Sequence, residues 1–360
     1  MKVLKKDSES GLQSLKKRFV KQLLAWNNNY NRRIMPWKGE KDPYRIWLSE
    51  IILQQTRVEQ GLKYYERFVE VFPLIKDLAK APQQQVFKLW EGLGYYSRCK
   101  NLITSAQYIT DELGGIFPKE YDSILALKGV GSYTASAIAS FAYNLPYAVL
   151  DGNVFRVLSR IFCIDIPIDS GEGKKVFALL AKELLLKNRS AIYNQGIMDF
   201  GATICKPLPE CAICFFKNHC KAFLEGRQLT LPVKLKRVVV KKRWFNYLVF
   251  SHDKFYVIHK RTQKDIWQSL FEFPLIESDK KALATDILIQ AQKSYGLDTI
   301  QYKGEVSFVQ RLTHQLIHFQ FLSIELSNKQ AFKNFNWVSK KELAAYPFPK
   351  TLQQYISSSL

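Results

Sequence analysis

The sequence predicts two domains, a mostly helical N-terminal domain and an α+β domain that follows it. Three observations predict this fold class. The length of 360 residues is enough for two domains with separate cores. Between about residue 10 and residue 225, apolar side chains recur at helical spacing, with Pro and Gly between the segments. Beyond that part, a stretch rich in Lys and Arg leads into runs that are typical of strands.

The helical domain is expected to cover residues 10–225. In residues 44–55 the apolar side chains at 44, 47, 48, 51 and 52 share one helix face, and Glu50 falls on the polar flank of that stripe. Similar patterns predict further helices at 60–71, 84–90, 98–113, 121–127, 133–142, 154–162, 174–187 and 191–202.

A basic connector is expected at 226–242, and an α+β domain at 243–358. Strand-like runs and one helix are predicted beyond the connector, at 244–250, 254–259, 302–309, 314–325 and 279–295. No apolar run approaches the length of a membrane span, and the N-terminus lacks the apolar core of a signal peptide. We therefore expect a soluble, cytoplasmic protein with no membrane partner.

The formal net charge of +21 points to a polyanionic partner. Lys and Arg side chains that neutralise phosphates release condensed counterions, which favours nucleic-acid binding. The alternative is a surface that is basic without binding any polyanion. Six cysteines in a chain of this length do not indicate a disulfide scaffold. Cys99 and Cys163 are isolated and are predicted to be buried packing thiols.

The other four cysteines are clustered, with the spacing C-x5-C-x2-C-x5-C. These are Cys205, Cys211, Cys214 and Cys220. Four thiolates can hold zinc or a [4Fe–4S] cluster, and the spacing alone leaves both open. The paired C-x2-C knuckles of a zinc ribbon are absent from the sequence. Such a ligand set indicates a reducing, intracellular setting.

A short Gly-rich segment, Leu127-Lys-Gly-Val-Gly131, lies between two amphipathic helices. Its glycines permit a tight hairpin, and backbone amides at the start of the following helix can bind a DNA phosphate. Such a contact is independent of base sequence. A G-x-G segment is also common in turns that bind nothing, and the flanking helices favour the phosphate-binding interpretation.

Two acidic residues are candidates for catalysis. Asp151 follows an apolar stretch and precedes Gly152-Asn153, where it could cap a helix as well as act chemically. Glu50 alone would most often be a solvated helix residue. Its neighbours Trp47, Leu53, Gln54 and Gln55 are poor surface choices together, which favours a site.

Several ordered segments together resemble the A/G-specific adenine DNA glycosylase family, of the helix-hairpin-helix, iron–sulfur superfamily of endonuclease III. They are Met35–Trp37, Trp47–Thr56, Trp90–Arg98, Leu127–Ala135, Leu150–Val154 and Asn194–Ala202. The resemblance spans about residues 15–222. The C-terminal third resembles the family's Nudix-like 8-oxoguanine recognition domain through Trp267–Pro274 and Leu312–His314. The resemblance implies a helix-hairpin-helix glycosylase domain with a [4Fe–4S] loop at 205–220, plus an α+β Nudix-like domain.

The resemblance also implies a mechanism. Glu50 would be the general acid that protonates adenine at N7, and Asp151 would stay ionised and stabilise an oxocarbenium-like sugar. Glycoside hydrolases divide two carboxyl groups in the same way. Tyr133 stands where bifunctional relatives carry a lysine, so the enzyme would be monofunctional. Tyr133 and Asn153 would shape the site beside Asp151.

The remaining site residues are carried over from the same motifs. A flipped adenine would enter a pocket lined by Arg33, Met35, Trp37 and Gln195, while Gln55 and Tyr95 would act as wedges in the base stack. Lys128, Gly129 and Gly131 would contact phosphate. Thr313 and His314 would lie in the loop that senses 8-oxoguanine. The resemblance favours a [4Fe–4S] cofactor on the four clustered cysteines, although their first interval is one residue shorter than is usual.

The prediction is therefore an adenine glycosylase of base excision repair, acting as a monomer on nucleoid DNA with A·8-oxoguanine or A·G mispairs. Nudix hydrolysis is rejected, because the candidate metal-binding helix at 282–293 carries a single acidic residue, Asp286. Two alternatives stay open. One is a bifunctional glycosylase/AP lyase, for which Lys128 could supply residual activity. The other is a non-catalytic, metal-braced DNA-binding protein.

Overall fold

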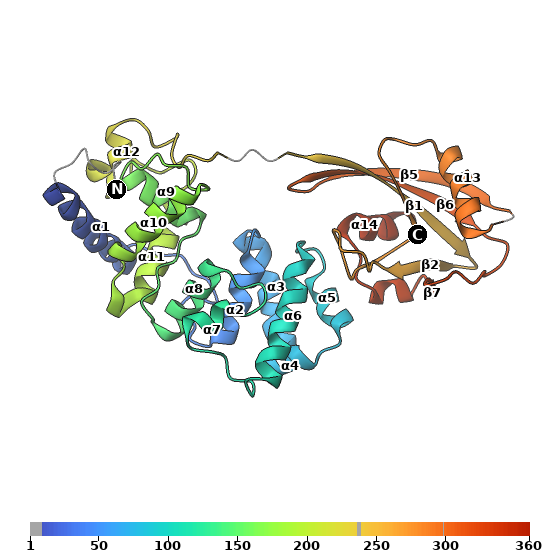
Figure 1. Ribbon diagram of the computed structural model, residues 1–360, viewed down its shortest axis with the longest axis horizontal. Helices are drawn as coiled ribbons and strands as arrows, with labels where there is room; N and C mark the ends of the chain where they lie inside the picture. Colours follow the sequence, from blue (N-terminus) through green and yellow to red (C-terminus); the bar gives the residue numbers. More distant parts are fainter. Residues whose placement is uncertain (1–8, 236–238, 298) are drawn as a thin grey trace. The chain divides into compact units, whose positions relative to one another are not determined.

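The computed structural model describes residues 9–235, 239–297 and 299–360 (Figure 1). Contacts divide the chain into two compact units. The first combines the chain up to Ala79 with the part that runs from Thr104 to the connector. The second combines Lys80–Ile103 with the C-terminal part after the connector. Residues 80–103 thus group with the α+β part, although the sequence predicted them within the helical domain.

The first unit is helical, as predicted. Its helices are α1 (Glu9–Asn29), α2 (Pro43–Leu53), α3 (Val58–Val71), α4 (Ile75–Lys80), α7 (Tyr121–Leu125), α8 (Ser132–Tyr143), α9 (Gly152–Ile161), α10 (Gly171–Leu184), α11 (Ser190–Thr203) and α12 (Lys221–Leu224). Short 3₁₀ turns occur at Lys187–Arg189 and Lys217–His219. Two further helices, α5 (Gln83–Trp90) and α6 (Tyr96–Asp111), begin in the second unit.

Most predicted helices differ from the observed ones only at their ends, and α10 shows why. The sequence predicted a helix at 174–187, but α10 begins at Gly171 and ends at Leu184. The Ser170 hydroxyl accepts a hydrogen bond from the Gly173 amide and caps the helix earlier than the apolar pattern indicates. Leu185 then takes an extended conformation that ends it.

One hydrophobic core cluster of the first unit lies between α1, α9, α10 and α11. Phe19 and Leu23 of α1 pack against the buried side chains of Val157 from α9 and Phe200 from α11. The aromatic ring of Phe216, from the cysteine-rich segment, lies 5.0 Å from that of Phe19. The cysteine-rich segment is therefore anchored in the same core as the helices.

The predicted hairpin is present between α7 and α8. Gly129 has φ +79°, a left-handed conformation that a side chain would strain. The Val130 amide donates to the Leu127 carbonyl, and Gly131 is the N-cap residue of α8. The Ser105 hydroxyl from α6 donates to the Lys128 carbonyl and holds the turn in place.

The second unit contains a mixed sheet. Its strands are β1 (Lys241–His252), β2 (Phe255–Lys260), β3 (Phe271–Glu272), β4 (Leu275–Ser278), β5 (Gln301–Arg311), β6 (Gln315–Glu325) and β7 (Asn336–Ser339). The order is β3-β2-β1-β6-β5, with β4 paired to β1 and β7 paired to β2. The β1 and β6 strands are parallel, and the other pairs are antiparallel.

Helices cover both faces of this sheet (Figure 1). On one face α14 (Lys350–Ser359) packs through Tyr355, whose ring stacks 4.2 Å from that of Phe321. On the other face α13 (Ala284–Tyr295) packs through Ile287 and Ala291 against Leu248. The predicted α+β architecture is confirmed, although α14 was not predicted.

Two boundaries in this unit were predicted wrongly. The predicted connector ran to residue 242, but Lys241 and Lys242 already pair with Gln315 and Leu316 in the sheet. Residues 236–238 of the connector lie outside the described residues. The helix predicted at 279–295 begins only at Ala284. Within the described ranges, no helix has both the length and the apolar character needed to cross a membrane.

Candidate active site

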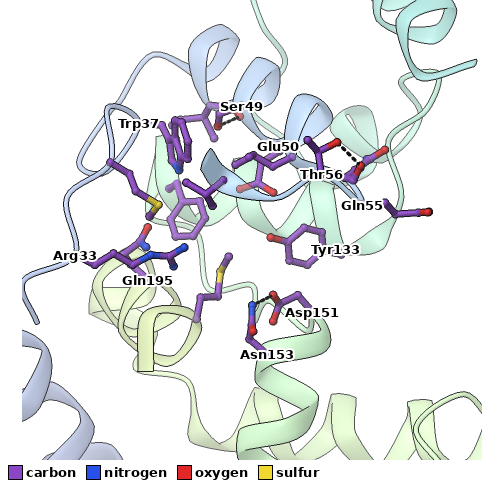
Figure 2. Close-up of a pocket in the computed structure, with 17 residues that line it drawn as sticks. Arg33, Trp37, Ser49, Glu50, Gln55, Thr56, Tyr133, Asp151, Asn153 and Gln195 are labelled. Atoms are coloured by element: carbon purple, nitrogen blue, oxygen red, sulfur yellow. Dashed lines mark hydrogen bonds between the residues drawn. The ribbon is translucent and has the colours of Figure 1, made fainter. Parts of the chain in front are cut away.

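A cavity of about 430 Å³ in the first unit brings together residues from α2, α8, α9, α11 and the loop before α2 (Figure 2). The predicted site residues on its lining are Arg33, Met35, Trp37, Glu50, Gln55, Tyr133, Asp151, Asn153 and Gln195. These residues are far apart in the chain, so the helical packing alone assembles them.

Glu50 projects from α2 and is only 8% exposed. The sequence placed it on a polar flank, which is wrong, because α2 is buried on nearly every side. The pKa of the Glu50 carboxyl is raised to about 7, mainly by burial. A hydrogen bond from Tyr133 lowers this pKa, and the negative charge of Asp151 raises it. At neutral pH a substantial fraction of Glu50 is therefore protonated and can donate a proton.

Tyr133 lies between the two carboxyl groups, in the first turn of α8 (Figure 2). Burial raises the pKa of its hydroxyl well above the usual range, and the charges of Glu50 and Asp151 add to this effect. The hydroxyl thus stays protonated and donates to Glu50. It can orient the Glu50 carboxyl toward the cavity.

Asp151 is the N-cap residue of α9, and both of its carboxylate oxygens are occupied. Oδ1 accepts from the Val154 amide at 2.7 Å, and Oδ2 accepts from Asn153 Nδ2 at 2.7 Å. Burial raises the pKa of Asp151 above its ordinary value, and these hydrogen bonds act in the opposite direction. The residue combines the two roles considered from the sequence, a helix cap and a carboxylate that faces the cavity.

Arg156 orients Asn153 and was not identified from the sequence. Its Nη2 donates to Asn153 Oδ1 at 2.8 Å and to the Gly201 carbonyl at 2.7 Å. Its Nε donates to the Cys205 carbonyl at 2.7 Å. A Cβ at Gly201 would lie 2.8 Å from Asn153 Cβ, so glycine is needed for the close approach of α11 to α9. Hydrogen bonds thus connect the segment of Cys205 to Asp151.

The four clustered cysteines have free thiols and line one small cavity. Arg160, which is 2% exposed, lies beside them and donates to the carbonyls of Lys206 (2.6 Å) and Pro207 (2.9 Å). In residues 9–235, 239–297 and 299–360, no three His, Cys, Asp or Glu side chains are arranged to hold a metal ion. A single zinc needs all its sulfurs around one point, whereas each thiolate of a cluster binds a different iron. The donor set, four thiols on one small cavity beside Arg160, is of the kind that both groups use.

The two isolated cysteines differ from each other. Cys99 is fully buried, as predicted, but Cys163 is only partly buried. Cys163 follows α9 with φ +51°, and its thiol donates to Glu225 Oε2 at 3.2 Å. The chain turns there, and this exposes a residue that the apolar pattern assigned to the core.

The other predicted site residues lie elsewhere. Lys128, Gly129 and Gly131 are exposed on the hairpin between α7 and α8. In the second unit, Tyr95, Thr313 and His314 line a cavity of about 680 Å³, and Tyr95 Oη lies 2.6 Å from Thr313 Oγ1.

The two residues predicted to be wedges share a strained backbone conformation. Gln55 and Tyr95 have φ +57° and +48°, values that are uncommon for residues other than glycine. Backbone strain of this kind concentrates at functional sites. No residue type or spacing in the sequence predicted these conformations.

The sequence missed further residues of the cavity lining, among them Ser49, Thr56, Phe141 and Met198. Phe141 and Met198 follow ordinary helical patterns, which predict only that they are buried. Asp199 is also buried next to the lining and contacts Arg33 and Gln195. Its spacing of four residues from Gln195 on one helix was the signal that could have indicated it.

Under the roles that the resemblance implies for Glu50 and Asp151, we expect release of the base to follow a bell-shaped pH profile. Above about pH 7 the rate should fall as Glu50 loses the proton that it must donate. At acid pH the rate should fall as Asp151, whose pKa is raised from 3.8, gains a proton. Single-turnover rates measured across pH check this. A rate that continues to rise well above pH 7 would exclude Glu50 as the acid.

Comparison with known proteins first shows the class of protein to which the fold and the site belong. Residues 48–179 match the HhH-GPD superfamily of base excision DNA repair proteins, and residues 246–358 match the NUDIX domain. The structure of a thermostable thymine-DNA glycosylase is similar, with a TM-score of 0.54 and 29% identity, over 59% of this chain and 99% of that one. An endonuclease III in a non-covalent DNA complex has the same fold, with a TM-score of 0.51 and 20% identity, over 58% of this chain and 97% of that one.

The particular family follows from full-length similarity. The adenine DNA glycosylase of Buchnera aphidicola subsp. Acyrthosiphon pisum (strain APS) is 32% identical over 347 residues, 94% of this chain and 97% of the relative. The adenine DNA glycosylase of Homo sapiens is 37% identical over 214 residues, 57% of this chain and 39% of the relative. The chain belongs to the adenine DNA glycosylase family. It is an enzyme of base excision repair that hydrolyses N-glycosidic bonds in DNA, which confirms the predicted class and removes the non-catalytic alternative.

Proposed function

We propose that this enzyme is a monofunctional glycosylase that removes adenine mispaired with 8-oxoguanine or guanine. The observation that carries the proposal is the pairing of Glu50, whose pKa is raised to about 7, with Asp151 on one cavity. Two carboxyl groups with different environments are what an acid-assisted glycosidic cleavage requires.

Adenine leaves the helix stack and enters the cavity, at a cost of roughly a few kcal/mol for unstacking and unpairing. Arg33, Met35, Trp37 and Gln195 hold the base. Glu50 gives its proton to N7 of adenine, and the bond between C1′ and N9 breaks with its electron pair going to the base. The departing adenine therefore leaves as a neutral molecule.

The carboxylate of Asp151 stabilises the positive charge that develops on the sugar, either by its charge or by a transient bond to C1′. Water then adds at C1′ and gives up a proton, which restores the acid for the next cycle. The products are free adenine and an abasic site. Asn153, fixed by Arg156, holds the Asp151 carboxylate in position.

The monofunctional outcome is supported by the chemistry of the lining. Strand cleavage by a lyase needs an amine that attacks C1′ and forms a Schiff base. Tyr133 supplies a phenol where a bifunctional enzyme supplies a lysine, and no lysine of the described chain is part of the cavity lining. Lys128 lies on the exposed hairpin instead.

The enzyme acts as a monomer on duplex DNA of the nucleoid. Its net charge of +21 supports the binding of DNA. The amides of the Lys128–Gly131 turn, at the N-terminus of α8, bind a phosphate of the target strand. Gln55 and Tyr95 fill the space that the flipped base leaves. Phosphate contacts of this kind position the enzyme without reading sequence.

The mixed sheet that begins with β1 at Lys241, together with α13 and α14, forms the proposed domain that recognises the base opposite adenine. The Thr313 hydroxyl can bond a group that distinguishes 8-oxoguanine from guanine, and its position 2.6 Å from Tyr95 Oη supports a joint role with the wedge. His314 lies on the same cavity and can contact the DNA backbone. Nudix hydrolysis is disfavoured, because Asp286 is the single acidic residue of α13.

Adenine release from A·8-oxoguanine, A·G and A·T duplexes tests the proposed substrate. We expect fast release from the first, slower release from the second and none from the third. Thr313→Val, which removes the hydroxyl and keeps the shape, should reduce the preference for 8-oxoguanine by about tenfold, the effect of one lost hydrogen bond. Ser307→Ala on β5 is the matched control. Equal preference in Thr313→Val and Ser307→Ala enzymes would exclude Thr313 from recognition.

The four clustered cysteines hold a [4Fe–4S] cluster, which supplies a rigid cross-link between four points of the chain. Cys205, Cys211, Cys214 and Cys220 are the ligands, and Arg160 lies beside them as a compensating charge. Metal and sulfide analysis of protein purified without oxygen tests this. We expect iron and acid-labile sulfide in equal amounts, and a single zinc ion per chain would contradict the proposal.

A further inference from the structure

A buried carboxylate outside the cavity lining holds two residues of the adenine pocket. Asp199 of α11 has a fully buried side chain, with 0% exposure. Its Oδ1 accepts from Arg33 Nη1 at 2.9 Å and from Gln195 Nε2 at 3.0 Å. Its Oδ2 accepts from Asn31 Nδ2 at 2.8 Å and lies 3.1 Å from Lys38 Nζ. Each oxygen therefore has two donors.

The consequence for Gln195 is a fixed orientation of its amide. A carboxylate can only accept hydrogen bonds, so the nitrogen end of the Gln195 amide must face Asp199. The carbonyl oxygen is then directed away from Asp199. Gln195 lines the cavity, where Figure 2 shows it beside Arg33, so this oxygen and the second N–H are available to a bound base.

We infer that Asp199 is a specificity-determining positioning residue, which fixes the polarity with which Gln195 reads the flipped base. This inference rests on the proposed function. A carbonyl oxygen held in this orientation accepts from the 6-amino group of adenine. The same carbonyl oxygen repels the 6-oxo group of hypoxanthine or guanine, because both groups are hydrogen-bond acceptors. A glutamine that presents both an acceptor and a donor matches the edge of adenine.

The loop between α1 and α2 is organised around the same carboxylate. The Arg33 amide donates to Asn31 Oδ1 at 3.1 Å, and Lys38 Nζ donates to the Arg33 carbonyl at 2.9 Å. Asn31, Arg33 and Lys38 thus contact Asp199 and one another. Met35 and Trp37, which also line the cavity, lie within this loop. The carboxylate therefore connects the loop to α11. It positions the loop residues and the α11 residue that line the cavity.

The test measures discrimination rather than activity alone. Single-turnover rates are measured on duplexes that carry adenine, hypoxanthine or unsubstituted purine opposite 8-oxoguanine. In Asp199→Asn the side chain can donate, so the Gln195 amide can turn over. We expect the adenine-to-hypoxanthine rate ratio to fall by about tenfold, as for one lost base contact. The rate on unsubstituted purine, which has no group at C6, should fall less than the rate on adenine.

Asp111→Asn is the matched control, because it makes the same carboxylate-to-amide change at an exposed position at the end of α6, outside the network around Asp199. Its adenine-to-hypoxanthine ratio should equal that of the wild type. Gln195→Leu should lose the discrimination by itself, and adding Asp199→Asn to it should change the ratio no further. Equal losses on all three bases in Asp199→Asn would indicate a purely structural role and overturn the inference.

Gln195→Leu decides the question if Asp199→Asn does not fold. A Gln195→Leu enzyme with the wild-type adenine-to-hypoxanthine rate ratio would overturn the inference, because the Gln195 amide would then make no contact that distinguishes the groups at C6. Failure of the proposed function is distinguishable from this result. If the wild type releases no adenine from any mispair, both the proposed function and this inference are excluded. If it releases adenine and the ratio is unchanged in the variants, only the inference is excluded.

Discussion

Glu50→Gln is expected to reduce the single-turnover rate of adenine release by about 10³-fold, within the range that general acid catalysis contributes. The amide has the shape of the carboxyl group but cannot give up a proton to N7. Binding of mispaired DNA should be unchanged, because Glu50 is 8% exposed and lies in the base cavity rather than on the exposed phosphate-binding hairpin. Gel-shift affinity and single-turnover kinetics on the same duplex check both parts.

The stability of the same variant provides an independent control. The pKa of Glu50 is about 7 in the folded chain and 4.5 ordinarily, so the folded state binds more protons between these values. Stability should therefore fall as pH rises from about 4.5 to 7, by up to the order of 3 kcal/mol. Glu50→Gln should remove this loss and be more stable than the wild type at pH 8. Retained turnover in a folded Glu50→Gln enzyme would remove Glu50 from the mechanism.

Asp151→Asn is expected to slow adenine release by about 10²–10³-fold, the loss typical when one charge-stabilising group is removed from an active site. The variant should fold, since Asn caps helices about as well as Asp and can still accept from the Val154 amide. The new amide would face the Asn153 amide, which Arg156 holds in place, so a modest loss of stability is expected.

The control for this variant is Asp111→Asn, which changes an exposed carboxylate at the end of α6. Rates, DNA affinity and thermal unfolding are measured for both. Asp111→Asn should match the wild type in all three. Normal turnover in Asp151→Asn would defeat the role assigned to this carboxylate, whereas loss of DNA affinity would indicate that it acts through the fold of α9.

The sequence predicted elements well where local patterns decide them. Amphipathic spacing located α3, α8 and α9, and two glycines located the hairpin. Resemblance to a known family assigned Glu50, Tyr133 and Asp151 to one active site. The packing of α2, α8 and α9 places all three on one cavity. The polar flank assigned to Glu50 was wrong, because a helix buried on all sides carries no stripe that distinguishes its faces.

Contacts between distant segments were not predictable. Arg156 and Asp199 looked like ordinary charged helix residues, and the partners that connect them to other segments lie about 45 and 165 positions away in the chain. The grouping of residues 80–103 with the second unit has the same origin. It depends on bonds such as that from the Phe348 amide to Glu91 Oε1, which no spacing in the sequence encodes.

The most direct test of the central claim is a strand-cleavage assay on a duplex with one adenine opposite 8-oxoguanine, beside a matched A·T duplex. Each sample is analysed with and without hot alkali, which breaks the strand at abasic sites. We predict breaks only in the strand with the mispaired adenine, and only after alkali. Breaks without alkali would identify a lyase, and no breaks despite tight binding would contradict adenine release by Glu50 and Asp151.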